Sequence, residues 1–443
     1  MKLTMKRINS KTVCAVCAAA LILGTVSGCG KPVKDAETAG ENENISEITP
    51  QETAAPTSTP KISTQYNSLD EGDKDEISQV RAELASVAQS CMDIYETADR
   101  GKAINAVLSA DTVRAMVDRI GQQGFAAVDY AGNLDMRCPE AIEYFGSQID
   151  GGSDISVSYY MVYNDGQISV YHLGRQNGLW YLIAMSSGWD KNCKPEILTE
   201  GRYVIGDVRY TDKGWLIYSR DTDSFDANQR SNTNSYVFVR VKPCDADKKA
   251  LCDKYIKPIG YFENNLFTTT WTQADFTPID FNSLFSMLFG MYNGTQSLTA
   301  SNVESYYPSV EGTRLSLIPT ENFERIVQQY FNIDSSVLKA ISDYSYERGG
   351  YYFLGYADGM YNITPRFPEP EVTDYWYNSD GSLTMRVDAV FKWYGTDRAF
   401  SHDVTVMETS GGFKYVSNTL YADETSILPE RKLSTLLDIE LGK

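Results

Sequence analysis

The chain has 443 residues, more than one hydrophobic core usually serves, so we expect roughly two or three domains. Its 59 acidic and 40 basic residues give a net charge of −19 at pH 7, which argues against nucleic acid as a partner. Only two histidines occur, which excludes a His-rich zinc site and leaves few ways to build a histidine-based catalytic triad.

The N-terminus has the pattern of a secretory signal over residues 1–29. Residues 1–11 carry four basic side chains and no acidic one, and residues 12–28 are apolar but too short to span a membrane comfortably. The segment ends in Val-Ser-Gly-Cys at 26–29, which resembles a bacterial lipobox. We therefore expect Cys29 to carry a diacylglycerol that anchors the protein outside the cell membrane. The alternative is an ordinary cleavage site beside an unrelated cysteine.

Residues 30–73 are rich in Glu, Thr, Pro and Ala and contain almost no large apolar side chains. This composition predicts a disordered acidic stalk, because the segment has too little apolar surface to form a core. As a flexible coil it would span about 35 to 40 Å, which places the cell wall within reach of the folded part.

The first predicted domain covers residues 74–295 and begins with helices. Apolar residues recur every three or four positions from Ile77 to Ala98, which predicts a helix from Asp75. A second helix is expected after a cap at Ser109 or Asp111, and a short third at 139–145. Alternating apolar residues and Gly-containing turns then predict an antiparallel meander. Its strands are expected at 155–163, 167–173, 179–185, 202–210, 215–220 and 235–241.

A very apolar helix is predicted over Phe281–Tyr292, with Asp280 as its cap. It is too short to cross a membrane. We expect an interdomain helix buried between two sheets, and the alternative is an exposed helix that docks a partner.

The second predicted domain covers residues 296–443 and has the same order of elements. Helices are expected after a cap at Thr320 and over 335–342, followed by strands at 350–356, 373–378, 383–394, 402–408 and 413–421. The fold class is therefore α+β, with two lobes that each place helices before an antiparallel meander. This order resembles the cone-shaped nuclear-transport-factor-2-like fold, although the chain has no internal repeat and the strands after Cys193 depart from that pattern.

Five cysteines remain beyond residue 29, so at least one thiol is unpaired in the monomer: Cys91, Cys138, Cys193, Cys244 and Cys252. A helix that starts at Asp245 would hold Cys244 and Cys252 about 10 Å apart, which argues against a bridge between them. Cys91 lies on the apolar stripe of the first helix, where a packing role is simpler than a reactive thiol.

Two groups of residues resemble reactive sites but lack the rest of the required pattern. Asp221, Asp223 and Asp226 are close enough for a calcium ion, but the glycine and the bidentate glutamate of an EF-hand are missing. His402 precedes Asp403 on a predicted strand, where neighbouring side chains point to opposite faces. We interpret the three aspartates as part of a solvated loop. We interpret His402 as a structural histidine, and His172 as another. We predict no catalytic, cofactor-binding or metal-binding residues.

Thirty tyrosines and six tryptophans are many for this length. Exposed rings can stack on sugars or peptides of a cell wall, although packing within sheets explains most of them more simply. Glycoside hydrolysis by a pair of carboxylates remains an alternative, because the sequence does not give the distance between two acidic side chains.

Several fragments together resemble an uncharacterised family of clostridial lipoproteins. They are LSADTVRAMVDRIGQQGFAAVD, KYIKPIGYFENNLFTTTW, IPTENFERIVQQYFNID and YNSDGSLTMRVDAVF, and the resemblance extends over about residues 75–421. It implies a surface lipoprotein of an anaerobic Gram-positive bacterium, which fits unpaired thiols. It implies no activity.

These observations predict a lipid-anchored, extracytoplasmic protein that acts as a non-enzymatic binding or accessory module. Its expected partners are the membrane, through the anchor, and either a wall glycan or peptide or a membrane protein. The alternatives are a wall-directed hydrolase and a sensor or assembly partner of a membrane complex, the latter favoured by an exposed helix at 281–292.

Overall fold

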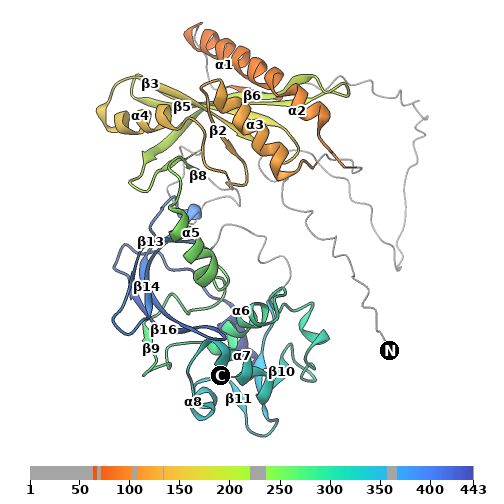
Figure 1. The fold of residues 1–443 in the computed structure, drawn as a ribbon, viewed down its shortest axis with the longest axis vertical. Helices are drawn as coiled ribbons and strands as arrows, with labels where there is room; N and C mark the ends of the chain where they lie inside the picture. Colours follow the sequence, from red (N-terminus) through yellow and green to blue (C-terminus); the bar gives the residue numbers. More distant parts are fainter. Residues whose placement is uncertain are drawn as a thin grey trace, which may run out of the picture. The chain divides into compact units, whose positions relative to one another are not determined.

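The computed structural model describes residues 63–66, 71–101, 107–132, 134–219, 236–356 and 367–442 (Figure 1). Residues 63–443 form one compact unit. The predicted signal peptide, Cys29 and residues 30–62 of the predicted stalk lie outside the described residues. No helix in the described part of the chain is long and apolar enough to cross a membrane.

After a short strand, β1 (Ser63–Tyr66), helices begin the described part of the chain as predicted, but the first helix differs at both ends. The elements are α1 (Glu71–Ser90), α2 (Met92–Thr97), α3 (Ala110–Gln122) and α4 (Glu140–Gln148). The helix expected from Asp75 to Ala98 starts four residues earlier and is interrupted at Cys91. Of the two caps expected for α3, Ser109 and Asp111, the structure has Ser109, whose Oγ accepts a hydrogen bond from the backbone N–H of Thr112 at 3.1 Å.

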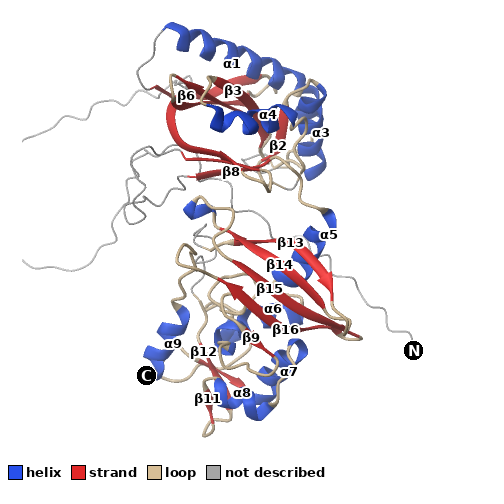
Figure 2. Cartoon of the chain, turned by 90° about the vertical axis from the view of Figure 1, so that its left-hand side faces the viewer, coloured by secondary structure: helices blue, strands red, loops and turns tan. Residues whose placement is uncertain are grey.

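A curled sheet of eight strands follows (Figure 2). Seven strands are hydrogen-bonded in the order β2-β3-β4-β5-β6-β7-β8, and β3 to β8 form the predicted antiparallel meander. Their bounds are Ala126–Asp129, Ile155–Val162, Ile168–Gln176, Leu179–Trp189, Pro195–Tyr210, Trp215–Ser219 and Tyr236–Arg240. The turn between β4 and β5 has Asn177 and Gly178 at φ 53° and 79°, as a two-residue hairpin requires.

Two pairings in this sheet are parallel and were not predicted. β2 pairs with β3, and β1 (Ser63–Tyr66) pairs with residues 199–202 of β6. The end of the segment that we expected to be disordered is therefore a strand. β6 is longer than predicted and changes neighbour along its length, from β5 in its first part to β7 near its end.

The curled sheet is apolar on both faces, because alternate residues of its strands point to opposite sides. Tyr160 and Ile183 belong to a buried cluster with residues of α1, α2 and α3, whereas Tyr159 and Leu182 belong to a second cluster with residues of α4. Helices on one side and α4 on the other thus exclude water from the middle strands.

The rest of the chain has helices and two smaller sheets. The helical elements are α5 (Ala246–Leu251), a π-helical turn (Cys252–Ile256), α6 (Phe281–Asn293), α7 (Thr320–Tyr330), α8 (Ser335–Ile341) and α9 (Leu433–Leu441). One sheet has the order β10-β12-β11 and the other β13-β14-β15-β16-β9. From β9 to β16 the bounds are Trp271–Thr272, Ser316–Pro319, Tyr344–Ser345, Gly350–Phe353, Glu369–Tyr377, Leu383–Val390, Ser401–Thr409 and Gly412–Tyr421.

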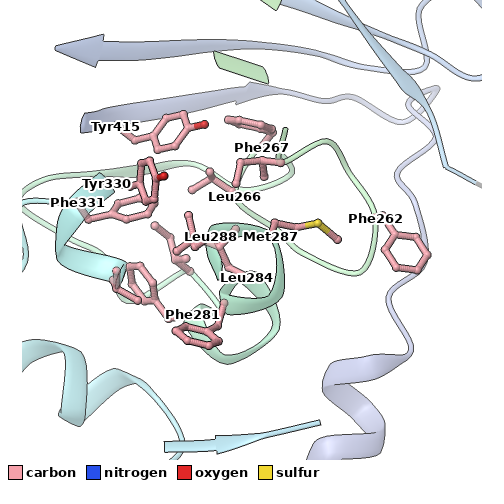
Figure 3. Packing of buried hydrophobic residues seen from close by; sticks show 14 of the residues in the cluster. Phe262, Leu266, Phe267, Phe281, Leu284, Met287, Leu288, Tyr330, Phe331 and Tyr415 are labelled. Atoms are coloured by element: carbon pink, nitrogen blue, oxygen red, sulfur yellow. The ribbon is translucent and has the colours of Figure 1, made fainter. Parts of the chain in front are cut away.

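Helix α6 lies within the largest hydrophobic cluster, which residues between 252 and 437 form (Figure 3). All its residues from Phe281 to Gly290 are buried, and Asp280 caps it by accepting a hydrogen bond from the Ser283 N–H at 3.0 Å. Phe285 stacks on Phe323 of α7 with 4.5 Å between ring centroids. We expected this helix at a domain junction, and its neighbours belong instead to the C-terminal core. Its apolar part is not exposed to dock a partner.

Polar contacts connect the end of the curled sheet to the β13–β16 sheet. Lys213 Nζ lies 2.7 Å from the buried carboxylate of Asp388, and Arg240 lies 2.9 Å from Glu371. The α+β class is confirmed by these mixed elements. The arrangement in two cone-shaped lobes remains a prediction.

Candidate functional site

His402 is completely buried and bonded on both ring nitrogens. Nε2 lies 2.9 Å from the Tyr261 hydroxyl, and Nδ1 lies 2.7 Å from Oδ1 of Asn418. Burial lowers the pKa of His402 to about 4. Asp403 points to the other face and binds Arg386 through two hydrogen bonds, as the strand alternation predicted. His402 and Asp403 are therefore not an orienting pair.

His172 lies in a hydrogen-bonded chain with a serine and a glutamate. Ser158 Oγ on β3 is 2.8 Å from Nδ1, and Glu76 Oε1 on α1 is 3.1 Å from Nε2. The strand register places Ser158 directly opposite His172, and α1 brings the carboxylate over the sheet. Sequence reasoning missed this chain because Glu76 is 96 residues from His172 and no motif connects them.

Further contacts fix the position and charge of Glu76. The Tyr181 hydroxyl donates a hydrogen bond to the same oxygen at 2.7 Å. Burial raises the pKa of Glu76, but the hydrogen bonds of His172 and Tyr181 and the charge of Arg202 outweigh it, so the pKa is lowered overall. Glu76 is therefore ionised at neutral pH and can accept a hydrogen bond from the Nε2–H of His172, while Nδ1 of the same ring faces the Ser158 hydroxyl.

Salt bridges surround this chain and hold α1 on the sheet. Arg202 of β6 lies 2.9 Å from Asp73 and 4.5 Å from the ring centroid of Tyr181. Arg81 binds Glu200 of β6 through two hydrogen bonds of 2.7 Å. We call Asp73, Glu76, Ser158, His172, Tyr181 and Arg202 the α1 polar cluster.

The α1 polar cluster has two chemical capabilities. A serine hydroxyl beside an imidazole that a carboxylate orients is the arrangement of a nucleophile and its general base. The same contacts form a polar clasp that fixes the start of α1 above β3 to β6. The side chains of His172 and Glu76 are 12% and 28% exposed, so this hydrogen-bonded chain is partly accessible to solvent.

The other candidate residues have simpler surroundings or lie outside the described residues. Asp221, Asp223 and Asp226 fall in the undescribed segment 220–235. Elsewhere in the described ranges, no group of three or more His, Cys, Asp and Glu side chains is placed to hold a metal ion. Cys244 and Cys252 are free, in agreement with the expected absence of a bridge. Cys91 is buried as expected, and burial raises its pKa to about 11.

Comparison with known proteins gives one match. The sequence profile of a family of unknown function, DUF6070, matches residues 77–433. The chain belongs to this family. The matched region runs from α1 to the first residue of α9 and includes Ser158, His172, Tyr181 and Arg202, while Glu76 immediately precedes it. No curated protein and no solved structure matches the chain.

Proposed function

We propose that the protein is a lipid-anchored binding or accessory module on the outer face of the cell membrane of a Gram-positive bacterium. The observation that carries this proposal is the Val-Ser-Gly-Cys sequence at 26–29, which follows a basic and then an apolar segment. Residues 30–62 then connect Cys29 to a unit that begins at β1. This length of polar chain would let the folded unit reach the cell wall.

Binding is favoured over catalysis by where the reactive side chains lie. His402 is sealed in the core, Cys91 and Cys252 are buried with pKa values raised to about 11, and Asp388 is held by cations. Such groups stabilise the fold and do not face a substrate. The Ser158–His172–Glu76 chain stays partly accessible, but its contacts also hold α1 on the sheet, so we place binding first.

The anchor is tested by Cys29→Ala, with Cys17→Ala in the apolar segment as the matched control. We expect wild-type and Cys17→Ala protein in the membrane fraction, cleaved before Cys29, with a diacylglycerol on that residue in N-terminal mass spectra. Cys29→Ala protein should be released or remain uncleaved. An unmodified Cys29 in the membrane-bound protein would exclude the lipid anchor.

A wall-directed hydrolase is the second candidate, and the contacts between Ser158, His172 and Glu76 favour it. In such an enzyme, Ser158 Oγ would attack an acyl ester while its proton moves to Nδ1 of His172, and Glu76 would stabilise the imidazolium. The imidazolium would return this proton to the departing alcohol. Water would then release the acyl group from the serine by the same route.

A fluorophosphonate probe separates the two candidates, because it labels only activated serines. If the protein only binds, we expect no labelling of Ser158 and no hydrolysis of 4-nitrophenyl acetate above background. Ser156→Ala serves as a control, because Ser156 lies two residues away on β3 and is exposed. Labelling that Ser158→Ala and His172→Gln abolish, and Ser156→Ala leaves intact, would make hydrolysis the better proposal.

A further inference from the structure

The β13–β16 sheet has one apolar and one polar face. Val387 and Val404 are fully buried and face the C-terminal core. Helices α6 and α7 lie on that side in Figure 1, and Figure 2 views the sheet from the other side. The register on this outer face aligns three rows of side chains across the strands: Trp376, Thr384, Thr405 and Ser417; Asp374, Arg386, Asp403 and Thr419; and Glu371, Asp388, Ser401 and Tyr421. In the third row, Glu371 and Asp388 are bound by Arg240 and Lys213 of the curled sheet. Thr384 and Asp388 are buried.

Hydrogen bonds within the rows hold these polar groups in fixed positions. Arg386 binds Asp403 through Nε and Nη2, and Thr384 and Thr405 share a hydrogen bond of 2.9 Å. The buried carboxylate of Asp388 accepts hydrogen bonds from Ser401 at 2.6 Å and Arg398 at 2.9 Å, so it positions these two groups and does not itself meet a ligand. Polar groups that are already ordered lose little conformational entropy when a ligand binds.

The charges on this outer face largely cancel. Asp403 is neutralised by Arg386, and Asp388 lies within salt-bridge distance of both Lys213 and Arg398. Asp374 adds one more carboxylate. The face therefore has no excess of positive charge that would attract an anionic polymer, and the whole chain is strongly acidic.

Two exposed aromatic rings lie at opposite corners of the outer face. Trp376 is 39% exposed at the edge strand β13, and Tyr421 is 48% exposed on β16. The Tyr421 hydroxyl donates to Asp403 at 2.9 Å, and the Arg386 guanidinium lies 4.9 Å from its ring centroid, so the ring is oriented. Three strand spacings and four residues separate the backbone positions of Trp376 and Tyr421, which is about 20 Å.

We propose that the outer face of β13–β16 binds a neutral, hydroxyl-rich glycan strand. Sugar rings present C–H groups that pack on aromatic faces, and their hydroxyls both donate to carboxylates and accept from guanidinium and threonine groups. Two exposed rings on residues whose backbones lie about 20 Å apart, with ordered polar groups between them, fit a chain of several sugars. A protein partner is less suited, because protein interfaces centre on a larger apolar area than two separate rings provide. This inference rests on the proposed binding function and names its ligand class.

Sedimentation of the full chain with insoluble chitin, a neutral polymer of N-acetylglucosamine, tests the proposal. We expect Trp376→Ala and Tyr421→Ala each to weaken binding about tenfold. Tyr377→Ala is the matched control, because Tyr377 is the next residue of β13, is 72% exposed and lies on the opposite face. It should bind within about twofold of the wild type. Unchanged melting temperatures would show that the variants fold.

Two results would overturn the glycan assignment. One is the absence of wild-type binding to chitin and to glycan strands from which peptides and anionic polymers have been removed. The other is equal loss of binding in Trp376→Ala and Tyr377→Ala. Stronger binding to an anionic polysaccharide such as heparin would contradict the charge argument. Lipidation of Cys29 is measured separately, so a failed glycan assignment leaves the anchored module itself intact.

Discussion

Both histidines have hydrogen bonds on each ring nitrogen, but only His402 is sealed from solvent. Asn418 donates through Nδ2 to the carbonyl of Thr269, which leaves Oδ1 to accept from Nδ1 of His402. The Tyr261 hydroxyl then donates to Nε2. This network keeps His402 neutral, because a second ring proton would place a charge in the core.

Acid should destabilise the protein through His402. The unfolded histidine takes up a proton below about pH 6.5, whereas the folded one resists until about pH 4, so stability falls as the pH drops between these values. This difference amounts to about 2 kcal/mol at pH 5. Urea denaturation at pH 7 and pH 5 measures it in the wild type and in His402→Gln, which should lose this contribution. Equal pH dependence in both proteins would contradict the neutral buried histidine.

At the scale of elements, α6 shows why an apolar helix need not be a docking helix. Two elements and a loop residue surround the ring of Phe285, which stacks on Phe323 of α7 and meets Phe353 of β12 and the loop residue Tyr307 edge-on. Asn282 on the same helix donates to the Tyr352 carbonyl at 2.7 Å and accepts from the Asp343 N–H at 2.9 Å. The helix thus joins α7 to the β10–β12 sheet.

Truncating a ring on this helix should be costly. We expect Phe285→Ala to lower the free energy of unfolding by about 3 to 5 kcal/mol, because the cavity would lie in a packed aromatic cluster. Tyr346→Ala removes a ring that is 78% exposed and should change stability by less than about 0.5 kcal/mol. Chemical denaturation compares them. A small effect of Phe285→Ala would contradict the buried position of α6.

At the scale of the whole molecule, contacts between residues far apart in the sequence hold the first two elements of the folded unit, β1 and α1, in place. β1 pairs with β6, and the salt bridges from Asp73 and Arg81 hold α1 to the same strand. Both β1 and α1 therefore fix the start of the folded unit to β6. The curled sheet in turn contacts the β13–β16 sheet through Lys213 and Arg240.

Limited proteolysis should separate the expected stalk from the folded unit. Brief digestion of the protein is expected to cut first within residues 30–62, where the composition provides no core. The product should be one large fragment that retains α9, because Leu433 and Leu437 are buried in the C-terminal core. Intact mass spectrometry identifies its ends. Early cleavage within α1 would contradict this boundary.

Local sequence signals determined most of the elements. The apolar period predicted α1, α3, α6 and α7, the Ser109 and Asp280 caps marked helix starts, and Asn177-Gly178 marked a hairpin. Each of these signals depends on a few neighbouring residues, so it can be recognised in a single sequence. Alternation on the strand also predicted that His402 and Asp403 point apart.

Only the tertiary structure decided what depends on residues far apart in the chain. Glu76 meets His172 across 96 residues, β1 pairs with β6, and the rows of the outer face combine strands whose alignment is set by packing. A sequence period gives the spacing along one element but not which element lies opposite it. The α1 polar cluster and the polar face of β13–β16 depend on which elements lie opposite one another. Each is complete only when separate elements pack on a shared core.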